Sequence, residues 1–160
     1  MKAMVQRCQW HKRENVLSYL SKNKQPEYKK KMQDAYNSNT YDEAENKLKA
    51  IITELKVINL SAANSLKEGL EETLTLHRLD LPIELRTVFK TTNCIESLNS
   101  QIARLTGRVT RWQNSKQIHR WVASALLDIE MRMRKVRGYK KLNKLRTAMQ
   151  NELKLNQSQI

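Results

Sequence analysis

The stretch Thr40-Tyr41-Asp42-Glu43-Ala44 has the pattern of a strong helix start. Thr40 is a favoured N-cap residue, and an acid three positions later completes the pattern of a capping box. Two acids in the first turn also suit the positive end of a helix. The apolar residues that follow recur at helical spacing, at Ala44, Leu48, Ile51, Ile52, Leu55 and Ile58. The segment therefore predicts an amphipathic helix that buries one face.

Similar stripes lie on both sides of this helix. Leu66, Leu70 and Leu74 form one row, which predicts a continuous helix from about Ala62. Further helices are expected over residues 13–20, 95–105, 118–133 and 140–153, with a polar loop or helix lead-in at 21–31 and a short apolar turn at 83–89. Residues 1–7 are the one candidate strand. With three glycines and two prolines in 160 residues, the sequence predicts a mainly α fold.

The charge is strongly positive and unevenly spread. The net charge is +14, and residues 101–160 hold 14 basic against 3 acidic side chains. Such a field favours a polyanionic partner, and nucleic acid is the commonest one. An anionic membrane surface and ribosomal RNA fit the charge equally well. No apolar run approaches the ~18 residues of a membrane span. Two cysteines give no disulfide framework, which predicts a cytoplasmic protein.

The stretch Thr91-Thr92-Asn93-Cys94-Ile95-Glu96 places one carboxylate in the first turn of an amphipathic helix. Asn93 followed by Glu96 also fits a capping box, which would give Glu96 a purely structural role. The downstream half of the same helix becomes basic. A lone helical glutamate beside arginines is what a metal-dependent enzyme of DNA strands would present, so both interpretations remain open.

Arg104, Arg108 and Arg111 lie within eight residues, and we expect them to contact DNA phosphates, although an ordinary solvated face has the same pattern. Lys116 and Arg120, on the polar side of the next helix, are weaker candidates. Trp112 and Trp121 are expected in the core, with stacking on DNA as the less favoured alternative. The basic stretch 132–146 fits phosphate contact and simple solubility equally well.

Several motifs occur in an order and spacing that resembles the C-terminal part of Mutator-type bacterial insertion-sequence transposases. The motifs are Gln6-Arg7-Cys8-Gln9-Trp10-His11-Lys12 with Asn15, Ala35-Tyr36, Tyr41-Asp42-Glu43-Ala44, Thr91-Thr92-Asn93 with Ile95-Glu96-Ser97-Leu98-Asn99, Leu105-Thr106-Gly107-Arg108, Arg111-Trp112-Gln113-Asn114-Ser115, Trp121-Val122-Ala123, Ala125-Leu126-Leu127-Asp128-Ile129-Glu130 and Val136-Arg137-Gly138-Tyr139.

The resemblance implies a member of the DDE superfamily with a ribonuclease-H-like core, in which two aspartates and a glutamate hold two Mg²⁺ or Mn²⁺ ions for phosphoryl transfer. Glu96 matches the glutamate, as a catalytic residue and metal ligand. Cys8, His11, Asn93 and Asn99 match positions that line the active site. Zinc at Cys8 and His11 is the less favoured alternative, because only Cys94, His77 and His119 remain as ligands.

The resemblance also divides the chain. Residues 1–12 match the region of the last core strand, residues 13–90 a helical insertion, residues 91–106 the Glu-bearing helix, and residues 107–160 a basic helical region. The implied fold is mainly α, as an incomplete ribonuclease-H-like core.

Both aspartates of the family lie upstream of the Cys8 motif, and Met1 stands directly before it. We therefore expect a transposase fragment that is inactive alone and needs no metal by itself. Its expected partners are DNA and either a second copy or a full-length transposase, near the bacterial nucleoid and not in a membrane. The alternative is a stand-alone helical nucleic-acid-binding module that regulates a full-length transposase.

Overall fold

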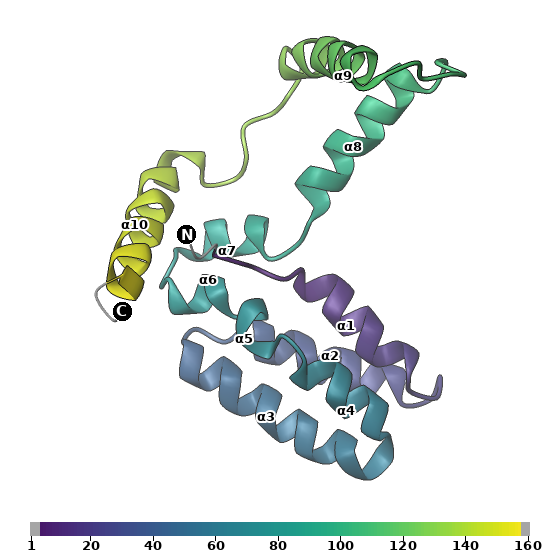
Figure 1. The fold of residues 1–160 in the computed structure, drawn as a ribbon. Coiled ribbons are helices and arrows are strands. Elements are labelled where there is room, and N and C mark those ends of the chain that lie inside the picture. Colours follow the sequence, from purple (N-terminus) through teal and green to yellow (C-terminus); the bar gives the residue numbers. More distant parts are fainter. Residues whose placement is uncertain (1–3, 158–160) are drawn as a thin grey trace. The chain divides into compact units, whose positions relative to one another are not determined.

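The computed structural model describes residues 4–157, which form a succession of helices (Figure 1). The elements are α1 (Gln9–Ser18), α2 (Gln25–Tyr36), α3 (Tyr41–Ile58), α4 (Leu60–Lys67), α5 (Leu70–Thr73), α6 (Thr75–Arg78), α7 (Ile83–Phe89), α8 (Asn93–Thr106), α9 (Ser115–Glu130), the 3₁₀ turn η1 (Tyr139–Lys141) and α10 (Leu142–Gln157). The mainly helical prediction is confirmed. Across the described residues, no helix combines the length and apolar character needed to cross a bilayer.

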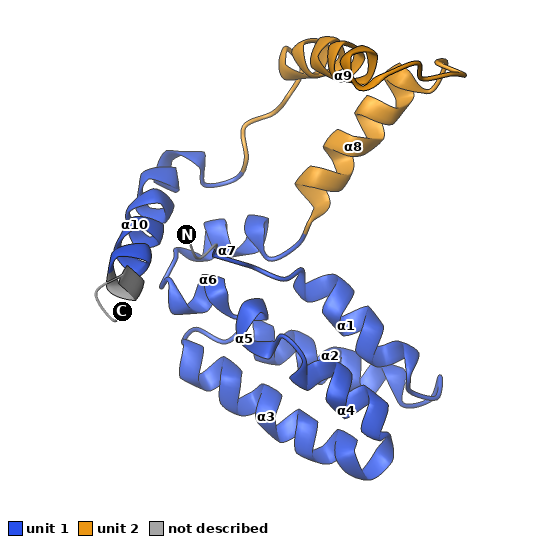
Figure 2. Cartoon of the chain, viewed as in Figure 1, with its two compact units in different colours: residues 1–91, 137–160 blue, residues 92–136 orange. Residues whose placement is uncertain are grey.

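The chain divides into two compact units, coloured separately in Figure 2. Unit 1 comprises Met1–Thr91 and Arg137–Ile160, and unit 2 comprises Thr92–Val136. The assignment of residues 1–12, 13–90, 91–106 and 107–160 to parts of a catalytic core stays a prediction.

Unit 1 has its main core between α1, α2, α3 and α4. The expected stripe of α3 is buried from Ala44 to Leu55, with Leu48 and Leu55 fully inaccessible, but its last member, Ile58, is 45% exposed at the end of the helix. Its N-cap is the predicted one, because the Glu43 backbone N–H donates to Thr40 Oγ1 at 3.3 Å. The helix therefore starts where its capping residues indicate and faces the core with its apolar stripe.

A second, smaller core joins α10 to the α6–α7 region. Leu76, Leu79, Leu81 and Leu85 are buried, and Leu145 and Ala148 of α10 pack against them. Ion pairs add to this contact: Lys141 Nζ lies 2.7 Å from Glu84 Oε1, and Arg78 Nε lies 3.1 Å from Glu152 Oε1. At least one lysine of the basic C-terminal stretch thus serves an internal contact.

The continuous helix expected from Ala62 is wrong, because the chain breaks at Gly69. Leu66, Leu70 and Leu74 are all buried, as their row predicted, but they belong to α4, α5 and the junction with α6. Gly69 has φ +67°, a conformation that favours glycine. A Cβ there would lie 2.6 Å from the Arg7 guanidinium, so the side chain of Arg7 occupies the space that a larger residue would need.

Three other local expectations need correction. Residues 4–8 form no strand, and residues 1–3 of the expected strand lie outside the described residues. The polar stretch 21–31 is a helix lead-in only over residues 21–24. It is helical from Gln25, because Pro26 lies in the first turn of α2, where a missing N–H costs nothing. Residues 83–89 form the short helix α7 rather than a turn.

Residues 6–9 do not pair in a sheet but form hydrogen bonds with the α5–α6 region. Arg7 N donates to Glu72 O at 2.9 Å, and Gln6 Oε1 accepts from Leu76 N at 3.1 Å. The buried Gln9 side chain donates to Thr73 O at 2.8 Å. Each of these residues is satisfied by the neighbouring helices, so the segment needs no sheet partner.

Lys12 is a buried lysine that caps the end of α4. Lys12 is 5% exposed, and its Nζ donates to Ser65 O at 2.8 Å and to Glu68 O at 2.6 Å. Glu68 Oε2 lies 3.3 Å from the same nitrogen. Since the last carbonyls of a helix have no intrahelical donor, Lys12 supplies what α4 lacks.

Replacing Lys12 by methionine should lower the free energy of unfolding by about 2 kcal/mol, because two carbonyls lose their donor while the apolar stem is kept. Denaturant unfolding of the full chain measures this loss. The matched control is Lys30→Met, at an exposed position of α2, where the change should stay within about 0.5 kcal/mol. Equal losses for the two variants would show that the capping role is wrong.

Candidate nucleic-acid interface

Unit 2 contains α8 and α9, which contact each other. Of its described residues, Ala125 and Ile129 are the buried ones, and α8 has no buried side chain. The prediction that Trp112 and Trp121 lie in the core is therefore wrong: they are 39% and 45% exposed. One facing helix covers only a narrow strip, so most of the apolar stripe of α9 stays accessible.

Glu96 is exposed on the first turns of α8. The expected capping register is wrong by one residue, because Thr92 is the N-cap and Asn93 is the first helical residue. Thr92 Oγ1 donates to Glu96 Oε1 at 2.5 Å, and Glu96 N donates to Thr92 O at 2.9 Å. This carboxylate is thus held near the helix N-terminus, where the helix dipole stabilises negative charge.

The other residues expected to line an active site fall in both units. In unit 1, Cys8 is half-buried directly before α1, and His11 is exposed with its ring edge-on to Trp10 at 4.8 Å between centroids. In unit 2, Asn93 and Asn99 are exposed on α8. That these residues share one active site stays a prediction.

The described residues do not fit a metal centre by themselves. Within residues 4–157, no three His, Cys, Asp or Glu side chains gather closely enough to hold an ion. Glu96 alone supplies too few ligands for a pair of divalent ions, which need several oxygen ligands each.

The five expected phosphate contacts all lie around the connection between α8 and α9. Arg104 lies in the last turn of α8, Arg108 and Arg111 lie in the connection that follows it, and Lys116 and Arg120 are one turn apart near the start of α9. All five are exposed. No ion pair among the described residues involves them, whereas Arg132, near the end of α9, pairs with Asp128. The connection therefore presents cations that are available to an external anion.

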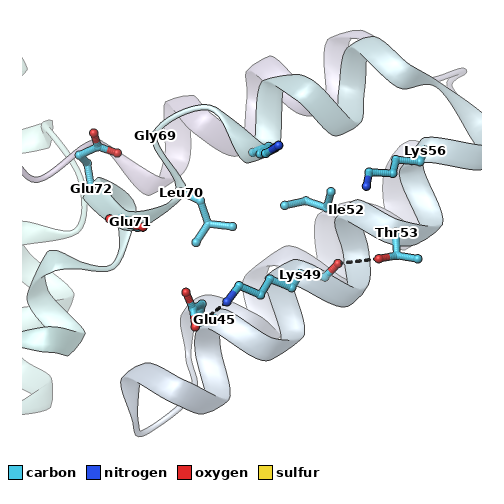
Figure 3. Close-up of a pocket in the computed structure, with 10 residues that line it drawn as sticks. Glu45, Lys49, Ile52, Thr53, Lys56, Gly69, Leu70, Glu71 and Glu72 are labelled. Atoms are coloured by element: carbon cyan, nitrogen blue, oxygen red, sulfur yellow. Dashed lines mark hydrogen bonds and ion pairs between the residues drawn. The ribbon is translucent and has the colours of Figure 1, made fainter.

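Unit 1 contains a pocket between α3 and the α4–α5 junction (Figure 3). Its cavity is about 540 Å³ and is lined by three lysines and three glutamates, together with Ile52 and Leu70. Lys49 is tied to Glu45 at 2.9 Å. With its charges balanced, this pocket has no preference for a polyanion.

Comparison with family models gives a match to "Transposase, Mutator family" over residues 1–135 of the 160. The chain belongs to the Mutator family of transposases. The matched part of this Mutator-family chain contains Glu96 and the five cations, whereas α10 lies outside it. No curated protein and no solved structure matches the chain.

Sequence reasoning missed the roles of Lys12 and Trp10 in this Mutator-family chain. Lys12 bonds to residues more than 50 positions away. Trp10 lines a pocket shared by three helical regions. Both residues lie in the motif at residues 6–12 that carries the resemblance, but no local pattern indicates that Lys12 is buried or that Trp10 lines a pocket.

Proposed function

We propose that this chain acts on DNA in transposition and binds duplex mainly through phosphates. The observation that carries the proposal is the set of five exposed, unpaired cations around the α8–α9 connection, within the part of the chain matched to the family. Unit 2 as a whole has eight basic and three acidic side chains, so its net charge is +5. The field extends beyond single contacts and favours the approach of a polyanion.

Phosphate contacts fix the position of a protein on duplex but carry no base information. Arginine is well suited to them because its planar guanidinium pairs with two phosphate oxygens at once. We therefore assign the leading contacts to Arg104, Arg108 and Arg111, with smaller contributions from Lys116 and Arg120.

Fluorescence anisotropy of the full chain with two labelled duplexes of unrelated sequence tests this function. Both duplexes should bind with affinities within about threefold of each other, since their phosphates are the same. Binding should also weaken steeply as the salt concentration rises, because each neutralised phosphate releases counterions. Failure to bind either duplex at low salt would overturn the proposed function.

Glu96 is proposed to be the one carboxylate that this chain contributes to the two-metal site of its family. Its exposure and its position in the first turns of α8 support a role outside the packing of the helix. When bound, the metal pair would activate the attacking oxygen and stabilise the leaving one. The fold of such a site as a ribonuclease-H-like core, and the inactivity of this chain by itself, belong to the same proposal.

A further inference from the structure

A second basic feature lies in unit 1, away from the cations of the α8–α9 connection along the chain. It is a cavity of about 220 Å³ formed by α1, by the C-terminal end of α2 and by the end of α7. Its lining residues are Gln9, Trp10, Arg13, Gln33, Tyr36, Asn37, Lys90 and Thr91. We call it the Trp10 pocket.

The walls of the Trp10 pocket are held together before any ligand arrives. Gln9 N donates to Lys90 O at 2.9 Å, which joins the start of α1 to the end of α7. Lys90 Nζ donates to Asn37 Oδ1 at 3.4 Å, which joins α7 to the end of α2. Tyr36 is buried, and this burial raises the pKa of its hydroxyl to about 12. The tyrosine is therefore a neutral wall at physiological pH.

The charge of the Trp10 pocket differs from that of the pocket between α3 and the α4–α5 junction. Arg13 and Lys90 line it, and no carboxylate does. Arg13 donates through Nε and Nη2 to Glu14 Oε1, at 3.3 and 3.2 Å, and Glu14 lies outside the lining. A site with two cations and no acid in its wall favours a ligand that carries phosphate.

The aromatic side chain of this pocket is accessible. Trp10 is 48% exposed, and its neighbour His11 contacts it edge-on, at an interplanar angle of 80°. An exposed indole beside cations is the combination with which proteins bind unpaired bases, since any base can stack on an aromatic face while its phosphates meet Lys or Arg. The carboxamides of Gln33 and Asn37 offer both donors and acceptors to the edge of a base.

The volume limits the ligand. Pockets for drug-sized molecules measure roughly 300–1,000 Å³. A cavity of about 220 Å³ is smaller than this range and suits one flat ring system rather than a base pair.

We propose that the Trp10 pocket binds a single unpaired nucleobase of a DNA strand, stacked on Trp10, with the flanking phosphates at Arg13 and Lys90. This inference rests on the proposed function only in taking DNA as the partner. A base that is already unpaired costs least to place in a pocket, so the chain should prefer DNA with an extrahelical base to a perfect duplex.

The test compares two short duplexes that each carry a one-nucleotide bulge, in one an adenine and in the other an abasic residue. Fluorescence anisotropy with the full chain should show about tenfold tighter binding to the adenine bulge, as expected for one stacked base. Trp10→Ala should abolish this preference and leave the affinity for perfect duplex unchanged. Tyr19→Ala is the matched control: it removes an aromatic side chain that is 50% exposed beyond the end of α1 and outside the pocket, and should keep the preference.

Each outcome decides between the two proposals. Binding to all duplexes without discrimination between adenine and abasic bulges overturns the pocket assignment and leaves the proposed function standing. A preference for the adenine bulge that persists in Trp10→Ala also overturns the pocket assignment. Two controls distinguish lost stacking from lost folding. Circular dichroism checks that the variant is folded, and Trp10→Phe should keep most of the preference. If no duplex binds, the proposed function fails. Titration with deoxyadenosine monophosphate, followed by the indole N–H signal of Trp10 in nuclear magnetic resonance, then tests the pocket alone, and an unmoved signal overturns it.

Discussion

A transposase completed by joining this chain to the upstream catalytic segments of a relative should lose strand transfer by about 10³-fold or more when Glu96 is replaced by glutamine. Glutamine keeps the length of the side chain and can accept the hydrogen bond that Thr92 Oγ1 now donates. It removes only the negative charge that divalent ions require. A gel assay of strand transfer in Mg²⁺ or Mn²⁺ measures the loss, and the chain without those segments should show no strand transfer.

The control for this change is Glu130→Gln, an exposed acid at the end of α9 in the same unit. It should leave strand transfer within about twofold, because it matches no catalytic position. Both variants should unfold within about 1 kcal/mol of the parent, since an exposed charge near a helix end contributes no more than that. A completed enzyme that tolerates Glu96→Gln would show that the carboxylate serves only the start of α8.

Replacing Arg104, Arg108 and Arg111 together by alanine should weaken duplex binding about 100-fold at ~0.1 M salt, because three counterion-releasing contacts are lost. All three side chains are exposed, so the change should leave the packing of α8 on α9 intact. Anisotropy at fixed salt measures the affinity, and circular dichroism checks the helix content.

The matched control changes three cations of unit 1, Lys22, Lys29 and Lys30, which are exposed. Lys31 is unsuitable because its Nζ bonds to Glu54 at 2.6 Å and to Glu27 at 2.9 Å, and those hydrogen bonds raise its pKa. The control should weaken binding less than about fivefold, as expected for a general loss of positive field. Equal effects of the two triple changes would mean that any surface cations serve equally well.

Local sequence signals predicted the elements whose ends and faces depend on nearby residues. Thr40 and Glu43 lie three positions apart, and the cap of α3 forms as expected. The break at Gly69 was not predictable in this way, because Leu66, Leu70 and Leu74 keep helical spacing across it. Only the folded structure shows that the side chain of Arg7, which is distant in sequence, packs against the backbone of Gly69.

The candidate site follows the same division. The exposure of Arg104, Lys116 and Arg120 was predictable from their place on polar helix faces, whereas Arg108 and Arg111 lie in the connection between the helices. The burial of Lys12 and the pocket beside Trp10 arise from contacts between segments far apart in the sequence, which no local pattern records. Trp121 was assigned to the core because its stripe has helical spacing, but spacing does not tell how many neighbours cover a helix.

The salt dependence of duplex binding tests the central claim most directly. Plotting the logarithm of the association constant against the logarithm of salt concentration gives a slope of about −0.9 for each phosphate neutralised. With five cations in contact, the unaltered chain should give a slope of about −4 or steeper. The Arg104/Arg108/Arg111 triple change should make that slope shallower by roughly two to three, and the Lys22/Lys29/Lys30 change should leave it nearly unaltered. Identical slopes for all three proteins would contradict the claim that the α8–α9 connection holds the DNA.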